Sequence, residues 1–267
     1  MGVADRINQL LTDPEAGLDR LLATIASIDQ PRQVGEDKSG LSVEDRVVDQ
    51  LDQMADACPD PGDPATVFDY VYGPLGFSGN LDDYYNPANS LIDRVLKRRR
   101  GIPLSLAAVV SEIGRRNGRD LRPVGLPGHV LLGEGPDPTR WFDPFNRGVA
   151  LGVDDCRALF GRIHPVESFD RDMLRPMTGL EVTIRTLNNL RIAYAKQGDI
   201  AKMIPVLELR VELPPAQIGD RRELADLLSG LGRYDQAGDQ YLLLAEEDPE
   251  NQEAHEARYQ ACRAHQN

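Results

Sequence analysis

Residues 100–106 read Arg-Gly-Ile-Pro-Leu-Ser-Leu. Gly101 ends one predicted helix and Pro103 begins the next, because glycine is favoured just after a helix and proline at its first position. Ser105 therefore lies in the first turn of a helix expected over residues 103–117. Free backbone N–H groups and the positive end of the helix dipole surround a side chain in that turn. A thiolate nucleophile would be stabilised there, which makes Ser105 the first candidate for a functional residue.

Two further polar residues follow in apolar surroundings. His129 ends the motif Leu-Pro-Gly-His at residues 126–129, and Asp143 is the centre of Trp-Phe-Asp-Pro-Phe at residues 141–145. Short apolar runs separated by Pro-Gly and Asp-Pro turns predict that both residues lie in strands of a small antiparallel sheet, packed on the preceding helix. Together with Ser105 they could form a nucleophile, a base and a residue that orients the base.

Each of the three residues also has an ordinary structural interpretation. Ser105 can be a hydroxyl that bonds to the backbone at its own helix N-terminus. His129 can be a partly buried histidine without a chemical role, and Asp143 before Pro144 can be a turn-forming carboxylate. The three residues in this order are less easily accidental than any one of them alone. A shared site is therefore the hypothesis that the sequence favours.

A basic run at residues 97–100 ends the helix before Gly101. Its structural interpretation is a helix C-terminus whose positive charges complement the helix dipole. Its functional interpretation is a dock for an anion or a carboxylate beside Ser105. The sequence leaves both interpretations open.

The composition is that of a soluble globular protein with an acidic surface. Of 267 residues, 41% are hydrophobic and 27% are charged, and the net charge is −13. Binding to nucleic acid needs a basic face that displaces counterions, so direct binding to nucleic acid is not expected. The same charge disfavours an anionic membrane surface, and no segment approaches 18 uninterrupted apolar residues. No membrane association is expected.

The cysteines and histidines predict neither a disulfide framework nor a metal site. Cys58, Cys156 and Cys262 are widely separated and include no CxxC pair. Their number and spacing fit a reduced compartment, and the N-terminus lacks a signal-peptide pattern, so a cytoplasmic protein is expected. Two aspartates precede Cys156 and should raise its thiol pKa, which opposes its use as a nucleophile. No histidine has ligand-spaced partners, so neither a metal nor another cofactor is expected.

The chain before and after this region is predicted to be helical. Apolar residues recur at three- and four-residue steps in residues 3–28 and 42–57, which predicts an N-terminal helical region over residues 1–88. The polar residues 29–40 between them predict a loop. A linker near residues 170–180, which includes Arg-Pro-Met-Thr-Gly at residues 175–179, is expected to mark the boundary to a further helical region.

An internal repeat marks the C-terminal region, residues 180–267. Gly198 and Gly232 are 34 residues apart, and so are Pro215 and Pro249. Glycine would close the first helix of each unit, and proline would follow the second. Two such helical hairpins resemble tetratricopeptide repeats. Two units cannot form a solenoid by themselves, so they are expected to pack on the rest of the chain.

Residues 89–160 resemble the bacterial SirB-type branch of the transglutaminase-like superfamily. The similarity rests on Asn-Ser-Leu at residues 89–91, the run that contains Ser105, the motif that ends at His129, and Asp-Pro-Phe-Asn-Arg-Gly at residues 143–148. It implies an α+β fold that is predominantly helical, with a small antiparallel sheet packed on helices. This papain-like or transglutaminase-like core would occupy residues 89–175, followed by tetratricopeptide-like helical hairpins.

The resemblance also implies a site. Catalytic members of the superfamily use cysteine, histidine, and aspartate or asparagine. The matching positions here hold His129 and Asp143, with Ser105 where the cysteine belongs. Two functions follow from this departure. One is a protein-interaction or regulatory protein that binds a peptide or protein and keeps a Ser-His-Asp relic of a Cys-His-Asp site. The other is a serine-dependent amide or ester hydrolase or acyl transferase. The oligomeric state stays open.

Overall fold

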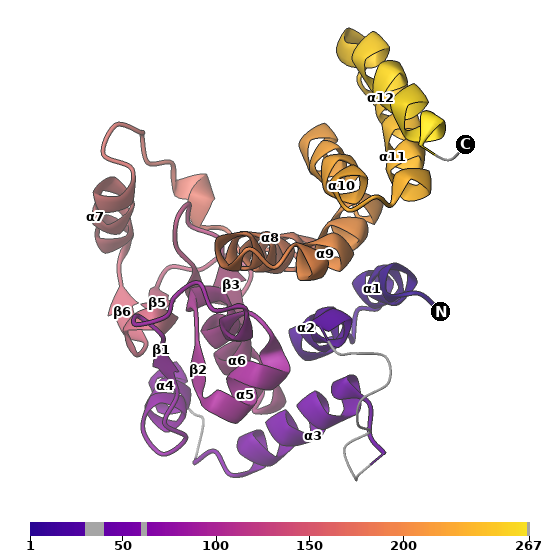
Figure 1. The fold of residues 1–267 in the computed structure, drawn as a ribbon. Coiled ribbons are helices and arrows are strands. Elements are labelled where there is room, and N and C mark those ends of the chain that lie inside the picture. Colours follow the sequence, from indigo (N-terminus) through magenta and orange to yellow (C-terminus); the bar gives the residue numbers. More distant parts are fainter. Residues whose placement is uncertain (30–39, 60–62, 266–267) are drawn as a thin grey trace. The chain divides into compact units, whose positions relative to one another are not determined.

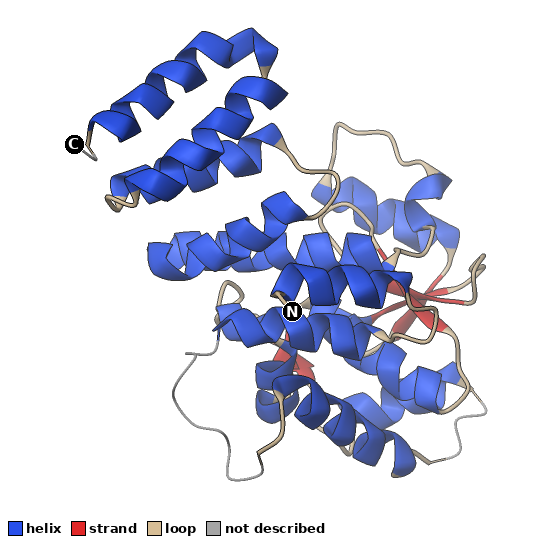
Figure 2. Cartoon of the chain, turned by 90° about the vertical axis from the view of Figure 1, so that its right-hand side faces the viewer, coloured by secondary structure: helices blue, strands red, loops and turns tan. Residues whose placement is uncertain are grey.

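The computed structural model describes residues 1–29, 40–59 and 63–265 (Figure 1). These residues are mainly helical and include a small antiparallel sheet, which confirms the predicted α+β class (Figure 2). The chain forms two compact units, mainly residues 5–186 and residues 187–267. The helices of the described part include none that is both long enough and apolar enough to cross a bilayer.

Two helices that precede the sheet begin at residues whose side chains accept hydrogen bonds from the first turn. Ser42 Oγ accepts a hydrogen bond from the Asp45 N–H at 3.0 Å, and Asp63 Oδ1 accepts one from the Ala65 N–H at 3.0 Å. The predicted loop at residues 29–40 lies, apart from its two end residues, outside the described part. The α-helices of this region are α1 (Val3–Thr12), α2 (Leu18–Ala26), α3 (Val43–Asp56), α4 (Pro64–Tyr72), α5 (Ile92–Arg98) and α6 (Pro103–Arg116). The short 3-10 helices are η1 (Ser27–Asp29) and η2 (Pro87–Asn89).

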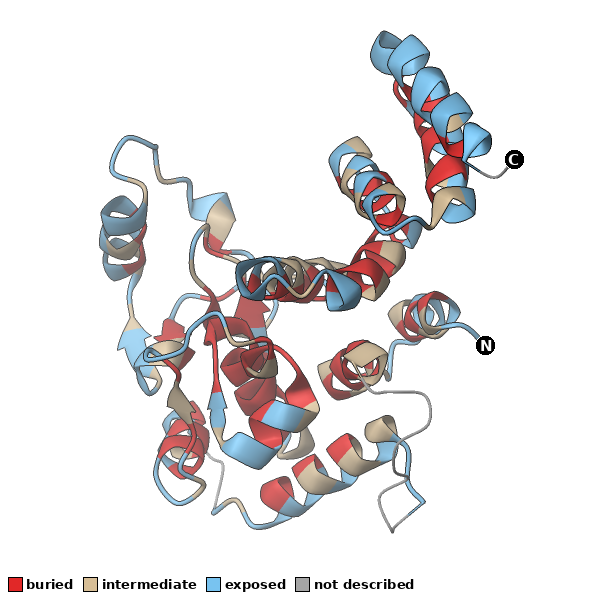
Figure 3. Ribbon diagram, in the orientation of Figure 1, coloured by how far each residue is buried: buried red, intermediate tan, exposed pale blue. Residues whose placement is uncertain are grey.

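Helix α6 is the centre of the larger unit. Every residue from Pro103 to Gly114 is buried (Figure 3). A helix that is buried on all sides must be covered on all sides, and here helices pack around it together with the sheet. Because the whole first turn is buried, a side chain in it can reach solvent or a substrate only through a gap between neighbouring elements.

The antiparallel sheet is a meander of four short strands in the order β3-β4-β5-β6, and α6 packs against β3 and β4. In the register, Leu132 of β4 faces Phe142 of β5, and Asp143 faces Val149 of β6. A parallel pair, β1 and β2, lies just before α6. The strands are β1 (Ser78–Gly79), β2 (Arg100–Gly101), β3 (Leu121–Val124), β4 (Leu131–Glu134), β5 (Trp141–Asp143) and β6 (Val149–Leu151). The following helices are η3 (Pro144–Asn146), α7 (Val153–Ile163) and η4 (Arg171–Leu174).

The turn before β4 carries His129, which the sequence had placed in the strand itself. The His129 N–H donates a hydrogen bond to the Leu126 carbonyl at 2.9 Å, and this closes a tight turn. Gly128 in that turn has a φ of 76°, in the left-handed region that favours glycine. A Cβ at Gly128 would lie 2.5 Å from Ile163 Cγ2, so the turn also packs closely on the end of α7.

The second unit consists of antiparallel helices joined by short turns. Gly198 and Gly232 have φ values of 68° and 73° and form the turns between paired helices, as the 34-residue spacing predicted. Pro215 and Pro249 lie in the equivalent connections that follow the second helix of each pair. The tetratricopeptide assignment itself stays a prediction. The helices are α8 (Gly179–Gln197), whose residues 179–186 belong to the larger unit, α9 (Ile200–Glu212), α10 (Ile218–Gly230), α11 (Tyr234–Glu247), η5 (Pro249–Asn251) and α12 (Gln252–Ala264).

Candidate functional site

Ser105 occupies the third position of α6, and only 3% of it is exposed. Its Oγ accepts a hydrogen bond from the Ile102 N–H at 3.1 Å, which satisfies one of the free donors at the start of the helix. The hydroxyl lies 2.6 Å from the carbonyl oxygen of Asn89 and 3.1 Å from that of Ile102. A serine has one proton to donate, and the shorter distance assigns it to Asn89.

Asn89 is the hub of a buried polar cluster. Its Oδ1 accepts hydrogen bonds from Asn80 Nδ2 at 3.0 Å and Arg98 Nη1 at 3.3 Å. Its Nδ2 donates to the carbonyl oxygens of Asp83 at 2.7 Å and Tyr84 at 3.1 Å. Since the Asn89 carbonyl also accepts from the serine of α6, this cluster fastens residues 80–89 to the first turn of that helix.

His129 and Asp143 form a hydrogen-bonded pair. The distance from His129 Nε2 to Asp143 Oδ1 is 2.9 Å, and each side chain is 13% exposed. The same oxygen accepts the backbone N–H groups of Phe145 at 2.9 Å and Asn146 at 3.2 Å. Asp143 therefore caps η3 while it holds the imidazole. Three donors on one oxygen fix the carboxylate, and the carboxylate fixes the ring.

The imidazole is oriented for acid–base chemistry at its other nitrogen. Because Nε2 donates to Asp143, the favoured neutral tautomer leaves Nδ1 unprotonated. Within the described part of the chain, no hydrogen bond to His129 Nδ1 is found. An unprotonated ring nitrogen on a carboxylate-oriented histidine is the arrangement that a general base requires.

The serine does not join this pair. Across residues 1–29, 40–59 and 63–265, no hydrogen bond connects the Ser105 hydroxyl with His129 or Asp143. The structure thus brings together two of the three predicted residues, while the third is held at the helix cap. The assignment of all three to one catalytic site stays a prediction.

Arg185, on the first half of α8, holds the turn that carries the histidine. Its Nη2 donates to the carbonyl oxygen of His129 at 2.7 Å and to that of Leu126 at 3.2 Å. Burial lowers the pKa of Arg185, and the nearby Tyr84 opposes this shift. Nothing in the sequence around Arg185 indicated this role, because its partners are backbone carbonyls more than fifty residues away.

Aromatic rings flank the pair. The ring of Phe145 lies edge to face with His129 at 6.5 Å between centroids and with Tyr84 at 6.0 Å. A Cβ at Gly79 would lie 2.5 Å from Phe145 Cε2, so the glycine of β1 makes room for the ring. Tyr72 donates a hydrogen bond to the Pro144 carbonyl, and burial raises the pKa of Tyr72, with a smaller contribution from the charge of Asp143. These contacts hold Phe145 beside His129 and fix the backbone that follows Asp143.

The basic run at residues 97–100 is used within the fold. The Arg99 guanidinium lies over the ring of Phe77 at 4.8 Å from its centroid, and Arg98 donates to Asn89. Arg99 has a φ of 57°, which ends α5 in a left-handed residue. Two of the four basic side chains are thus held by contacts within the fold, and both interpretations of the run stay predictions.

Other potential chemistry is sparse. Burial raises the pKa of the Cys156 thiol to about 12, and the charge of Asp155 adds to the shift. The direction agrees with the sequence-based argument, although burial is the larger cause. The described side chains include no group of three or more His, Cys, Asp or Glu residues that could hold a metal ion.

Comparisons with known proteins identify relatives of the core. A family model described as the transglutaminase-like superfamily matches residues 43–188. A UPF0162 protein of Xylella fastidiosa is 37% identical over 136 residues, which are 49% of this chain and 48% of the relative. A UPF0162 protein of Pseudomonas aeruginosa is 32% identical over 183 residues, or 66% of each chain. The protein SirB1 of Salmonella typhimurium is 28% identical over 147 residues, or 54% of each chain. The chain spans about half the length of the Xylella relatives that it matches.

Proposed function

The chain belongs to the SirB-type UPF0162 branch of the transglutaminase-like superfamily, and we propose that it is a protein-interaction or regulatory protein that keeps the relic of a Cys-His-Asp site. One observation carries this proposal. The Ser105 hydroxyl, at the position that the resemblance gives to the cysteine, donates its proton to the Asn89 carbonyl. The helix cap and residues 80–89 therefore occupy the group that would have to attack a substrate.

Physical chemistry supports the loss of catalysis. A serine hydroxyl hardly ionises by itself and needs a base within about 3 Å to become a nucleophile. A thiol at a helix N-terminus ionises far more readily, because the helix dipole stabilises the thiolate. Replacing the thiol by a hydroxyl removes that advantage, and burial of Ser105 removes access as well. Without catalysis, the larger unit is a folded core in which Asp143 orients His129. The second unit would offer surfaces for binding a peptide or protein.

The test is covalent labelling of the whole chain with an activated fluorophosphonate, followed by mass spectrometry of the peptide that contains Ser105. We expect no adduct on this peptide, and we expect the same result for Ser105→Ala. An adduct on Ser105 in the natural protein that is lost in Ser105→Ala would overturn the proposal.

A second candidate is a serine-dependent hydrolase or acyl transferase. The contact of 2.9 Å between His129 Nε2 and Asp143 Oδ1 favours it, because these two residues are arranged as a base and the residue that orients it. The hydroxyl of Ser105 would have to leave Asn89, attack the carbonyl carbon of an amide or ester, and pass its proton to His129. The C–N or C–O bond of the substrate would then break, the departing amine or alcohol would take the proton from His129, and water or an acceptor nucleophile would cleave the acyl-serine. The labelling experiment separates the two candidates, since only a mobile, activated serine reacts.

A further inference from the structure

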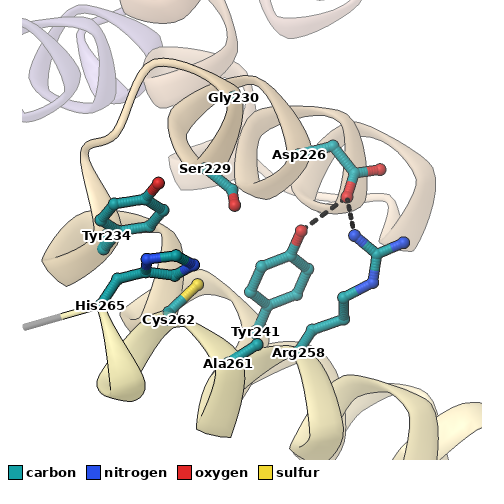
Figure 4. A pocket seen from close by; sticks show the side chains of 9 residues that line it. All are labelled: Asp226, Ser229, Gly230, Tyr234, Tyr241, Arg258, Ala261, Cys262 and His265. Carbon is teal, nitrogen blue, oxygen red and sulfur yellow. Dashed lines mark hydrogen bonds and ion pairs between the residues drawn. The ribbon is translucent and has the colours of Figure 1, made fainter.

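A pocket with a volume of about 390 Å³ lies between α10, α11 and α12 of the second unit (Figure 4). Its size is in the range of sites that take a large side chain or a small ligand. Figure 4 shows a polar end formed by Asp226, Tyr241 and Arg258, and an aromatic end formed by Tyr234 and His265. All these residues belong to the second unit, so the pocket is complete within it.

The polar end presents a fixed carboxylate. Tyr241 is 2% exposed, and its hydroxyl donates to Asp226 Oδ1 at 2.6 Å. Burial and this hydrogen bond raise the pKa of Tyr241, so the phenol stays protonated and remains a donor. The Asp226 side chain is 51% exposed, and no hydrogen bond within the described part occupies its Oδ2. Tyr241 thus holds Oδ1 of the Asp226 carboxylate, while Oδ2 is available to a ligand.

Arg258 lies at the same carboxylate but does not bind it closely. Its Nη1 is 3.9 Å from Asp226 Oδ1, beyond hydrogen-bond distance, and its side chain is 66% exposed. A guanidinium that binds a carboxylate well uses two parallel hydrogen bonds of about 2.8 Å. Exposed, loosely paired ions contribute little to stability, so a better placed cation can displace Arg258. The position of Arg258 near Asp226 indicates that the polar end of the pocket attracts a guanidinium group.

The aromatic end and the overall charge point the same way. The rings of Tyr234 and His265 stack at 4.4 Å between centroids with an interplanar angle of 10°. The face of a tyrosine ring attracts cations, and a planar guanidinium can also stack on it. Residues 187–267 contain nine Lys and Arg residues and fourteen Asp and Glu residues, a net charge of −5. A basic segment is therefore drawn to this unit by its long-range field as well.

We propose that this pocket binds an arginine side chain from a basic peptide segment of a partner protein. The guanidinium would donate to Asp226 Oδ2, displace Arg258 toward solvent, and stack near the Tyr234–His265 pair. The inference rests on the proposed interaction function and adds the chemistry of the partner. It does not involve Ser105, His129 or Asp143.

The test uses three peptides of alanine and glycine that carry a single central arginine, lysine or glutamate. Each is titrated into the whole chain, and binding is followed by NMR shifts of the backbone amides around the pocket. We expect the arginine peptide to shift these amides most and the glutamate peptide to leave them unchanged. In Asp226→Asn, which keeps an acceptor for Tyr241, affinity for the arginine peptide should fall about tenfold or more.

Two glycines of α10 provide a matched pair of variants. A Cβ at Gly230 or at Gly219 meets no atom within 4 Å, but only Gly230 lines the pocket. Neither position has a left-handed φ, so both accept a side chain without backbone strain. Gly230→Leu should therefore abolish binding of the arginine peptide by filling the pocket, and Gly219→Leu should leave it unchanged.

The variant Arg258→Gln tests whether the pocket binds a cation or an anion. If Arg258 competes with the incoming guanidinium, this variant should bind the arginine peptide several-fold more tightly. If the pocket is an anion site, the glutamate peptide should bind the natural protein and lose affinity in Arg258→Gln, and that result would overturn the inference. Absence of pocket shifts with the arginine peptide at millimolar concentration would also overturn it. Neither result concerns fluorophosphonate reactivity at Ser105, so the two proposals fail separately.

Discussion

Ser105 shows how one side chain can satisfy the structural demands of a helix start and thereby be withdrawn from chemistry. Its oxygen accepts from Ile102, and its proton goes to the carbonyl of Asn89. Both partners are backbone groups in the core of the unit, where a missing hydrogen bond is costly. The role of Ser105 is therefore structural: its hydroxyl joins the start of α6 to the segment that ends at Asn89.

We expect Ser105→Ala to lower the free energy of unfolding of the larger unit by about 1–2 kcal/mol, because it removes a cap and leaves the Asn89 carbonyl without this donor. Trp141 is the chain's single tryptophan and is buried in this unit, so its fluorescence during urea denaturation reports the change. The matched control is Ser168→Ala, at an exposed position, which should change stability by less than about 0.5 kcal/mol. Equal effects of the two substitutions would contradict the structural role of Ser105.

At the scale of elements, an ion pair and capping hydrogen bonds of Glu181 together stabilise the start of α8. Glu181 accepts hydrogen bonds from the backbone N–H of Thr178 at 2.8 Å and from the Thr178 hydroxyl at 3.1 Å. The Arg175 guanidinium donates to both oxygens of the same carboxylate. The hydrogen bond with Arg175 is the main cause that lowers the pKa of Glu181 to about 2, and burial opposes it.

The lowered pKa of Glu181 predicts a pH dependence with a definite sign. A carboxyl group whose pKa is lower in the folded state adds stability that is complete above its unfolded value of about 4.3 and is lost as the pH falls toward 2. The difference in stability between the natural protein and Glu181→Gln should therefore be constant from pH 7 to pH 5 and shrink below pH 4. The pair is exposed, so the difference should stay below about 1 kcal/mol. A difference that grows on acidification would contradict the assigned partners.

The turn that carries His129 depends on an element far away in sequence. Arg185 of α8 supplies the donor for two of its carbonyls. Replacement by methionine keeps much of the apolar stem but removes the donor, so we expect Arg185→Met to lower stability by about 1.5–3 kcal/mol. The NMR signals of the His129 ring should also shift or broaden, because the turn loses its fixed position. Arg175→Met, which removes an exposed partner on the same segment, serves as the control and should leave the ring signals unchanged.

At the scale of the whole molecule, the sequence predicts secondary structure better than it predicts which distant residues contact each other. The alternation of helix and turn signals predicted the α+β class and the helical hairpins, since periodicity and glycine or proline positions report local structure directly. The meeting of His129 and Asp143 was expected from the resemblance, although His129 lies in the turn before β4 and not in the strand that the sequence predicted. The carbonyl that accepts from Ser105 and the contact with Arg185 depend on tertiary packing, for which no local pattern exists.

The pocket of the repeat unit illustrates the same difference. The 34-residue spacing placed the turns at Gly198 and Gly232, but it did not indicate that Asp226, Tyr241 and Arg258 would meet. These three residues come from three different helices, so their proximity is a property of how the helices pack. Function in this chain is thus read from contacts between elements rather than from any single motif.

The most direct measurement is the ¹⁵N NMR spectrum of the His129 imidazole, compared between the natural protein and Ser105→Ala. If the serine hydroxyl is bound to the Asn89 carbonyl, the Nδ1 resonance should be the same in both proteins. If the hydroxyl instead donates to Nδ1, its removal should move that resonance. The second result would restore Ser105 to a triad and contradict a structural role.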